Sequence, residues 1–307
     1  MQLSINASAN LANPNLEVLR EHAKQAKADG FAGWWLAQTG LVDALTVFTA
    51  IASEVPDIEF GTAVIPTYPR HPTMLAGQAL TTQAAIGGRL TLGIGLSHKP
   101  QVEGQWGMSF DRPVRHMLDY LNVLQPLVET GQVSYRGEAF TRVGEPMARP
   151  TDVAPPVMIA ALGPQMLKIA GSRTAGTILW MVGEKTIESH IAPVMNEAAA
   201  EAGRPTPRVL CSLPVCITDN AGPVKEFAAA ALKIYGELPS YRAMLDREGA
   251  AGPADVGLFG TEAEVAERLA NIKAAGATDF AAVEFVGTPA DAERTRAFLK
   301  DQIAAVA

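Results

Sequence analysis

The sequence predicts an α/β protein, a (β/α)8 TIM barrel with insertions after helix 4 and between strands 7 and 8. Short apolar runs alternate with longer amphipathic stretches, and eight such β-then-α units follow one another along the chain. No shift in composition marks a domain boundary, so we expect one domain over residues 1–307. A Rossmann-like enzyme of two domains is the alternative that the alternation alone leaves open.

The apolar runs place the eight strands at residues 3–7, 34–38, 59–65, 90–97, 157–162, 177–181, 209–218 and 280–286. Helices are expected at residues 15–29, 42–53, 112–129, 186–202 and 262–275, and directly after Pro72 and Gly163. Two connections are too long for a simple loop. In the first, residues 133–156, the sequence at 135–140 is typical of a small hairpin. In the second, residues 238–258, a short helix is expected at 240–247. The second insertion is either a lid or an ordered surface element.

Composition restricts the compartment and the partners. The net charge is −7 and the sequence has no basic stripe, which argues against binding to nucleic acid. No apolar run reaches the roughly 18 residues of a membrane span. The first residues lack the basic start of a signal peptide. Cys211 and Cys216 lie five apart on one predicted strand, on opposite faces, so no disulfide is expected. We therefore expect a cytoplasmic protein with a small-molecule substrate.

The run from Leu90 to His98 is the strongest candidate for a functional segment. It ends in Gly93-Ile94-Gly95, where the backbone can approach a ligand closely, and Ser97 and His98 follow at the strand end. A dinucleotide fingerprint would need a third glycine, which is missing here. An ordinary strand end with a loop histidine is the other interpretation.

A second candidate lies after the fifth strand. Pro164 suits the first position of a helix, which leaves the amides of Gly163, Gln165 and Met166 free to bind a phosphate. A plain helix start explains the same residues. The prolines at 66, 69 and 72 stiffen a loop that carries Arg70 and His71, either of which could be solvated surface. The five histidines, at 22, 71, 98, 116 and 190, lack the spacing of metal ligands, so no metal is expected.

Several motifs together resemble a known family. The segments 61–64, 70–72, 87–95 and 160–164 resemble the luciferase-like monooxygenase superfamily, and the segments 95–100, 106–113 and 238–246 resemble its branch of coenzyme F420-dependent oxidoreductases. The resemblance covers essentially the whole chain in order.

The resemblance implies a deazaflavin lying across the carboxyl ends of the barrel strands, with a non-prolyl cis peptide at Ala63-Val64 behind its ring. The cofactor-binding residues that it implies are Gln38, Thr39, Thr62, Ala63, Val64, Leu96, Ser97, His98 and Gln101, and, around the phosphate, Ala161, Leu162, Gly163, Pro164, Gln165 and Met166. It also implies a homodimer, and the predicted helical stretches 41–51 and 74–86 are apolar on more than one face.

The chain departs from the family's sugar-phosphate enzymes at two positions. Gln38-Thr39 replaces an Asp-His pair, and His98 replaces a glutamate, so sugar-phosphate oxidation is doubtful. Imidazole titrates near neutral pH, so His98 is the expected proton donor and Gln38 orients the substrate. Glu284 either provides an alternative acid or faces the helices and meets an arginine.

The expected function is hydride transfer between F420 and a small, fairly apolar carbonyl, imine or activated alkene. Four side chains near strand ends either line an apolar pocket or belong to the core: Trp35, Trp106, Trp180 and Met181. An FMN-dependent two-component monooxygenase and a flavin-binding protein without turnover are the alternatives, because one fold supports all three functions.

Overall fold

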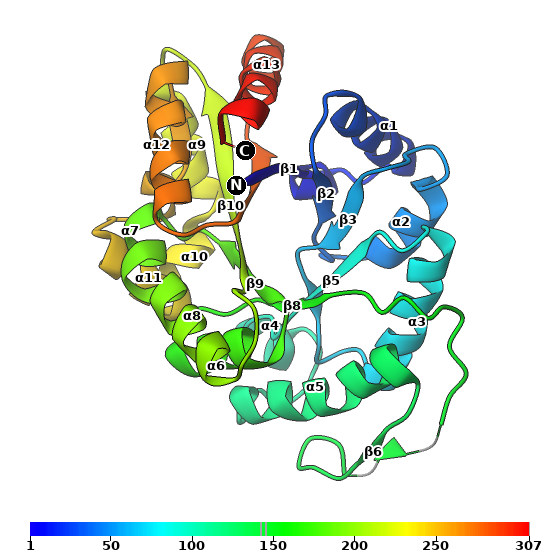
Figure 1. Ribbon diagram of the computed structural model, residues 1–307. Coiled ribbons are helices and arrows are strands. Elements are labelled where there is room, and N and C mark those ends of the chain that lie inside the picture. The colour runs from blue at the N-terminus through cyan, green and yellow to red at the C-terminus, as the bar shows by residue number, and fades with distance from the viewer. Residues whose placement is uncertain (142, 145, 307) are drawn as a thin grey trace. The chain divides into compact units, whose positions relative to one another are not determined.

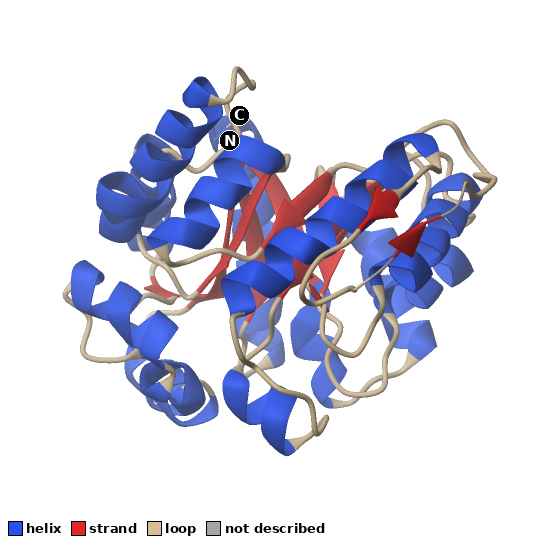
Figure 2. Ribbon diagram, turned by 90° about the horizontal axis from the view of Figure 1, so that it is seen from below, coloured by secondary structure: helices blue, strands red, loops and turns tan. Residues whose placement is uncertain are grey.

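A computed structural model describes residues 1–141, 143–144 and 146–306 of the chain. Residues 1–35 and 161–307 form one compact unit, and residues 36–160 form another. Among the described residues, eight parallel strands each lead into one or more helices, which is the arrangement of a (β/α)8 TIM barrel (Figure 1). Figure 2 colours the same elements by type, with helices blue and strands red. The predicted fold class is thus confirmed, and a single domain over 1–307 stays a prediction.

The first unit is built on parallel strands that pair in the order β2, β1, β12, β10 and β9. Their bounds are β1 Gln2–Asn6, β2 Gly33–Leu36, β9 Gly176–Trp180, β10 Arg208–Ile217, β11 Leu258–Gly260 and β12 Asp279–Glu284, with β11 beside the carboxyl end of β10. Its helices are η1 Ala7–Ala12, α1 Leu16–Ala28, α6 Pro164–Arg173, α7 Glu184–Thr186, η2 Ile187–Ile191, α8 Ala192–Glu201, α9 Ala221–Ala231, α10 Lys233–Glu237, α11 Pro239–Glu248, η3 Pro253–Asp255, α12 Glu262–Ala274 and α13 Pro289–Val306.

The second unit contains parallel strands in the order β3, β5 and β8, with β4 beside the end of β5. The bounds are β3 Glu59–Thr62, β4 Ile65–Pro66, β5 Leu90–Gly95 and β8 Val157–Ile159, and the helices are α2 Ala44–Ile51, α3 Pro72–Ala85, α4 Lys99–Gly104 and α5 Pro113–Thr130. The predicted hairpin is present as the antiparallel strands β6 Ser134–Tyr135 and β7 Val143–Gly144. Strands β3, β5 and β8 are buried along almost their whole length, as is expected of parallel strands covered by helices.

Local side-chain chemistry explains where the helices begin. The side chains of Asn15, Asp43 and Thr261 accept backbone N–H bonds in the first turns of α1, α2 and α12. Pro72 and Pro113 occupy the first positions of α3 and α5, where the missing N–H costs nothing. Each of these helices begins within two residues of its predicted first residue.

Several predicted element boundaries differ from those of the structure. The strand expected over 59–65 is interrupted at Ala63 and Val64, which are joined by a cis peptide and lie between β3 and β4. The helix expected over 186–202 is divided into α7, the π-helical turn η2 and α8. Helices α9 and α10 and strand β11 were not predicted. Helix α9 is rich in alanine, and α10 and β11 have only five and three residues, so each carries little hydrophobic periodicity.

Both insertions are tied to the helices beside them. The buried carboxylate of Asp119 on α5 accepts bonds from the Tyr135 hydroxyl at 2.6 Å and from the amides of Glu138 and Ala139 at 2.8 Å. Glu248 on α11 accepts bonds from the amide and hydroxyl of Thr186 at 2.9 and 2.7 Å. These contacts favour an ordered surface insertion over a lid at residues 238–258.

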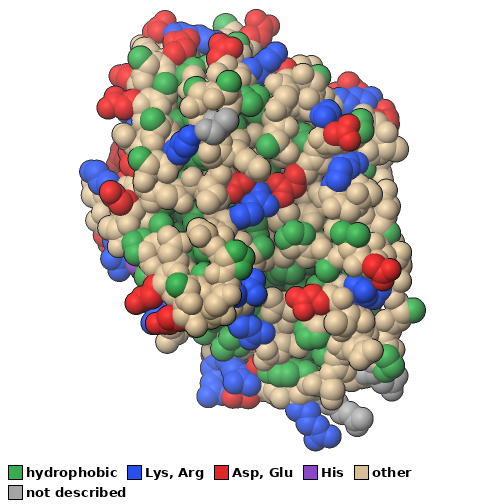
Figure 3. All heavy atoms as spheres, viewed as in Figure 1, with side chains coloured by type: hydrophobic (Ala, Val, Ile, Leu, Met, Phe, Trp, Pro, Cys, Tyr) green, Lys and Arg blue, Asp and Glu red, His purple; other side chains and the backbone are tan. Residues whose placement is uncertain are grey.

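Cys211 and Cys216 are free and buried on β10, as their odd spacing predicts. No helix in the described part of the chain is long and apolar enough to cross a membrane. On the face shown in Figure 3, acidic (red) and basic (blue) side chains are interspersed among uncharged ones.

Candidate functional site

The carboxyl ends of β3, β4 and β5 bring together part of the predicted site. The Ala63-Val64 peptide is cis, as predicted. A side chain at Gly95 would begin 2.6 Å from the Val64 Cγ2 atom, so the glycine is what lets Val64 lie against the end of β5. The hydroxyl of Thr62 bonds both the carbonyl and the amide of Gly93, at 2.7 and 2.8 Å. Thr62 therefore fixes β3 to β5, and its side chain is fully buried.

Gln38 lies beside the cis peptide and carries an unsatisfied group. Its backbone amide donates to the Val64 carbonyl at 3.3 Å. The side-chain oxygen Oε1 is buried and has no hydrogen-bond partner among the described residues. A buried acceptor without a partner is costly, which indicates a ligand donor at this position. Thr39, the next predicted residue, is exposed.

The loop after β5 presents Ser97 and His98. Ser97 has a left-handed backbone with φ 61°, a conformation that non-glycine residues rarely adopt and that is concentrated at functional sites. Its hydroxyl donates to Oε1 of Gln101 at 2.9 Å. His98 begins α4 and is half-buried, as is Leu96. Burial lowers the pKa of His98 below its usual 6.5, so the neutral imidazole predominates at pH 7.

The predicted phosphate site is the start of α6 in the other unit. Gly163 is the N-cap, and no side chain caps the helix. Gly163, Pro164 and Gln165 are exposed, whereas Ala161 and Met166 are buried and Leu162 is half-buried, its carbonyl accepting a bond from His190 Nε2 at 2.9 Å. A side chain at Gly163 would meet nothing within 4 Å, so the backbone there is open to a ligand.

The predicted pocket residues have different surroundings. Trp35 is fully buried, and its Nε1 atom has no hydrogen-bond partner within the described ranges. Met181 is also fully buried and has a left-handed φ of 55°. Trp106 and Trp180 are half-buried. The Trp180 ring meets Tyr235 edge-on at 6.1 Å between centroids. Tyr235 comes from α10, a helix that the sequence pattern did not reveal.

Arg70 and His71, the charged residues of the proline-rich loop, have structural partners. Arg70 bonds Asp43 at 2.6 Å and Gln78 at 2.9 Å. The ring nitrogen Nδ1 of His71 accepts a bond from the amide of Thr73 at 3.2 Å and so caps α3.

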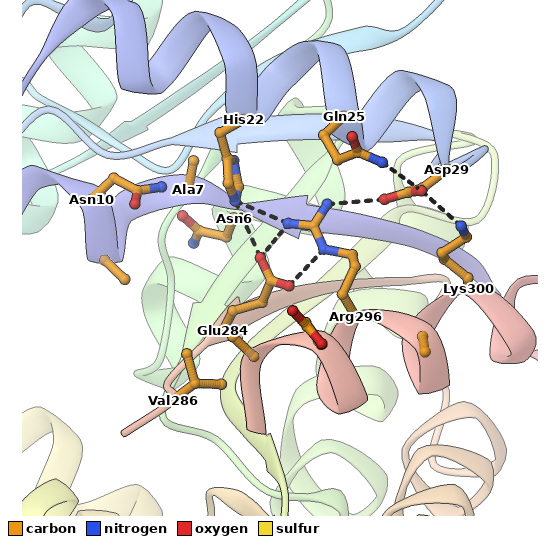
Figure 4. Close-up of a pocket in the computed structure, with 14 residues that line it drawn as sticks. Asn6, Ala7, Asn10, His22, Gln25, Asp29, Glu284, Val286, Arg296 and Lys300 are labelled. Atoms are coloured by element: carbon orange, nitrogen blue, oxygen red, sulfur yellow. Dashed lines mark hydrogen bonds and ion pairs between the residues drawn. The ribbon is translucent and has the colours of Figure 1, made fainter. Parts of the chain in front are cut away.

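Glu284 faces the helices and meets an arginine, which is the second of the two predicted alternatives. Figure 4 shows it pointing toward Arg296 of α13 and His22 of α1, at one side of a cavity of about 550 Å³. Arg296 Nε donates to Glu284 Oε1 at 2.6 Å and Nη1 to Asp29 at 3.3 Å. The indole of Trp34 donates to His22 Nδ1 at 3.0 Å, and His22 Nε2 lies 3.1 Å from Glu284 Oε2 and 3.0 Å from Arg296 Nη2. Glu284 is therefore engaged outside the candidate site.

Comparison with known proteins identifies the family. The sequence matches the luciferase-like monooxygenase family over residues 1–301, and the chain belongs to that family. A 5,10-methylenetetrahydromethanopterin reductase from Methanolobus tindarius is 25% identical over 251 residues, which are 80% of this chain and 76% of the reductase.

Two solved structures share the fold. An F420-dependent secondary alcohol dehydrogenase in complex with an F420-acetone adduct has a TM-score of 0.84 at 18% identity, over 100% of this chain and 99% of the other. The oxygenating constituent of 3,6-diketocamphane monooxygenase from Pseudomonas putida, in complex with FMN, has a TM-score of 0.77 at 17% identity, over 99% and 98%.

Proposed function

We propose that the chain is a coenzyme F420-dependent oxidoreductase that transfers a hydride between the deazaflavin and a small, fairly apolar carbonyl, imine or activated alkene. The observation that carries the proposal is the group of residues at the ends of β3, β4 and β5. A buried acceptor at Gln38, the close packing of Val64 on Gly95 and a half-buried imidazole at His98 all belong to the unit 36–160. Relatives named as F420-dependent enzymes support this cofactor.

The residues present fit a deazaflavin. Its pyrimidine ring carries N–H groups, and the unsatisfied Oε1 of Gln38 is an acceptor that such a donor would satisfy. When bound and reduced, the cofactor supplies a hydride. His98 then gives a proton to the substrate atom beside the carbon that is reduced, for example a carbonyl oxygen. Ser97 and Gln101, which bond each other at 2.9 Å, hold the loop that carries His98.

Titration of the purified protein with F420 and, in parallel, with FMN tests the cofactor. We expect saturable quenching of F420 fluorescence and weaker binding of FMN. Oxidation of reduced F420 is then followed by absorbance with a panel of ketones, imines and enones. Tight binding of FMN alone would overturn the proposal, and would favour the monooxygenase instead.

We also propose that the cofactor phosphate binds the amides of Gly163, Gln165 and Met166. Gly163→Val should weaken F420 binding about tenfold or more by crowding these amides, since a hydrogen bond to a charged group contributes about 1.5–3 kcal/mol. The thermal unfolding midpoint should change little, because the space around Gly163 is open. Equal F420 affinity in variant and wild type would place the phosphate elsewhere. Arg70 and Lys99 would be tested next, although each already faces a carboxylate, Asp43 at 2.6 Å and Glu103 at 3.8 Å.

A homodimer is a further proposal, as the family resemblance implies. Leu41, before α2, and Met74, on α3, expose 105% and 65% of their surface, and both are apolar. Such side chains are typical of an interface when they gather on one face. Light scattering at micromolar concentration should give twice the chain mass of 32.4 kDa. Met74→Glu should shift this mass toward the monomer, whereas a monomeric wild type would contradict the proposal.

A further inference from the structure

The loop between β4 and α3 contains a tyrosine whose hydroxyl has no partner. Tyr68 exposes 8% of its surface, and its hydroxyl is buried without a hydrogen-bond partner in the described structure. Most buried hydroxyls in proteins are bonded, so an unbonded one requires an explanation. Removing a hydroxyl from water without a new bond costs about 1–3 kcal/mol. A ligand that supplies the missing partner is one such explanation.

Tyr68 lies in the unit that carries Gln38 and His98, at the same ends of the strands. Strand β4 pairs with the last residues of β5, Pro66 with Gly95, and the Thr67 amide bonds the Gly95 carbonyl at 2.9 Å. Tyr68 is the next residue after Thr67. The loops after β4 and β5, which carry Tyr68 and His98, therefore leave the sheet side by side.

Neighbouring rings hold the phenol in one orientation. The Tyr68 ring stacks on His116 of α5, with centroids 4.0 Å apart and an interplanar angle of 3°. His116 Nε2 lies 3.1 Å from the Thr67 hydroxyl, which anchors the imidazole to the same loop. The Phe110 ring also contacts the tyrosine, with centroids 5.3 Å apart and an interplanar angle of 30°. Tyr68 is thus a preorganised side chain in apolar surroundings, with a single polar atom.

The protonation state suits a hydrogen-bond donor. Burial, and secondarily the charge of Asp111, raises the pKa of Tyr68 to about 12, so the phenol keeps its proton at neutral pH. Phe110 belongs to the loop between α4 and α5, and so does Trp106, one of the predicted pocket residues. An apolar ligand site that fixes orientation by a few polar groups has this composition.

We propose that Tyr68 is a ligand-positioning residue whose hydroxyl donates a hydrogen bond to a carbonyl or hydroxyl oxygen of the bound cofactor or substrate. The inference rests on the proposed function for the identity of these ligands. It adds a residue that is absent from the predicted site, and it assigns the ligand an oxygen acceptor at this position.

The test compares Tyr68→Phe with a matched control, Tyr120→Phe. Tyr120 belongs to the same aromatic cluster, but its fully buried hydroxyl donates to the Arg70 carbonyl at 2.8 Å. Without ligand, Tyr120→Phe should lower the thermal midpoint by about 2–4 °C, the effect of one lost hydrogen bond in a protein of this size. Tyr68→Phe should leave the midpoint unchanged or raise it, because no bond is lost.

In ligand binding, we expect the larger effect from Tyr68→Phe and not from Tyr120→Phe. Tyr68→Phe should raise either the Kd for F420, measured by fluorescence, or the KM for the panel carbonyl with the highest turnover, by about threefold to tenfold. A raised Kd assigns the bond to the cofactor, and a raised KM alone assigns it to the substrate. Tyr120→Phe should change neither.

Two results would overturn the inference. One is a Tyr68→Phe protein destabilised as much as Tyr120→Phe, since the hydroxyl would then have a partner in the fold. The other is an unchanged Kd together with an unchanged KM. A wild type that fails to bind F420 would count against the proposed function itself, and the ligand-free comparison would still decide whether the hydroxyl has a partner in the fold.

Discussion

His98→Ala should lower turnover by about 10²–10⁴-fold, the usual contribution of a general acid or base. The imidazole follows β5 by three residues and is the titratable group of this loop closest in sequence to Gly95. F420 affinity should stay within several-fold of the wild type, because the proton moves only during the reaction. A histidine that merely packed against the cofactor would give lost affinity and nearly intact turnover at saturation.

The pH dependence gives an independent test of this role. Burial lowers the pKa of His98 below 6.5, so its imidazolium form is lost as pH rises through that lowered value. Reduction of a carbonyl needs the imidazolium as acid, so its rate should fall as pH rises through the same value. Oxidation of the alcohol needs the neutral imidazole as base, so its rate should rise. His98→Ala should lack both slopes.

A matched control comes from the same unit of the structure, in the loop before α3. Burial also lowers the pKa of His71, but this histidine caps α3. His71→Asn keeps a capping side chain and should retain wild-type turnover and pH profile. If His98→Ala also retained both, His98 would not be the proton donor, and bound water would be tested next.

The interiors of the strands could be predicted from the sequence, but their ends could not. Buried parallel strands are continuous apolar runs, which single-sequence patterns reveal directly. The strand predicted to reach Ser97 stops at Gly95, because Ser97 adopts a left-handed backbone. Such a conformation depends on the loop that follows and leaves no periodic signal. The cis peptide at Ala63-Val64 was predicted only through the family resemblance.

The residues of the candidate site could be proposed from the sequence, but the hydrogen bonds that they form could not. Thr62 was expected to bind the cofactor, and the structure adds that its hydroxyl donates to the Gly93 carbonyl and accepts from the Gly93 amide. Tyr68 was overlooked because an unsatisfied hydroxyl becomes visible only when every neighbour is placed. Glu284 could be an acid or a structural partner until the structure placed Arg296, twelve residues later, beside it.

Glu284→Gln should lower the free energy of unfolding by about 3 kcal/mol, at the low end of the cost of removing one partner from a buried ion pair. The Glu284 and Arg296 side chains are only 15% and 17% exposed. The amide would leave Arg296 with one carboxylate, Asp29, which Lys300 also binds at 2.9 Å. Urea unfolding at pH 7 measures the change, and the network in Figure 4 shows why several elements would loosen together.

The effect should depend on pH in a defined direction. Burial alone would raise the pKa of Glu284, but the bonds from His22 and Arg296 outweigh it and lower the pKa to about 2. The carboxylate's contribution is therefore complete above about pH 4.5 and is lost as pH falls through about 2. The difference between wild type and variant should shrink over that range. Glu262→Gln breaks a comparable pair with Arg294 at 2.6 Å on the surface, and should have little effect. If both variants lost the same free energy of unfolding, the Glu284–Arg296 pair would contribute no more than a surface salt bridge.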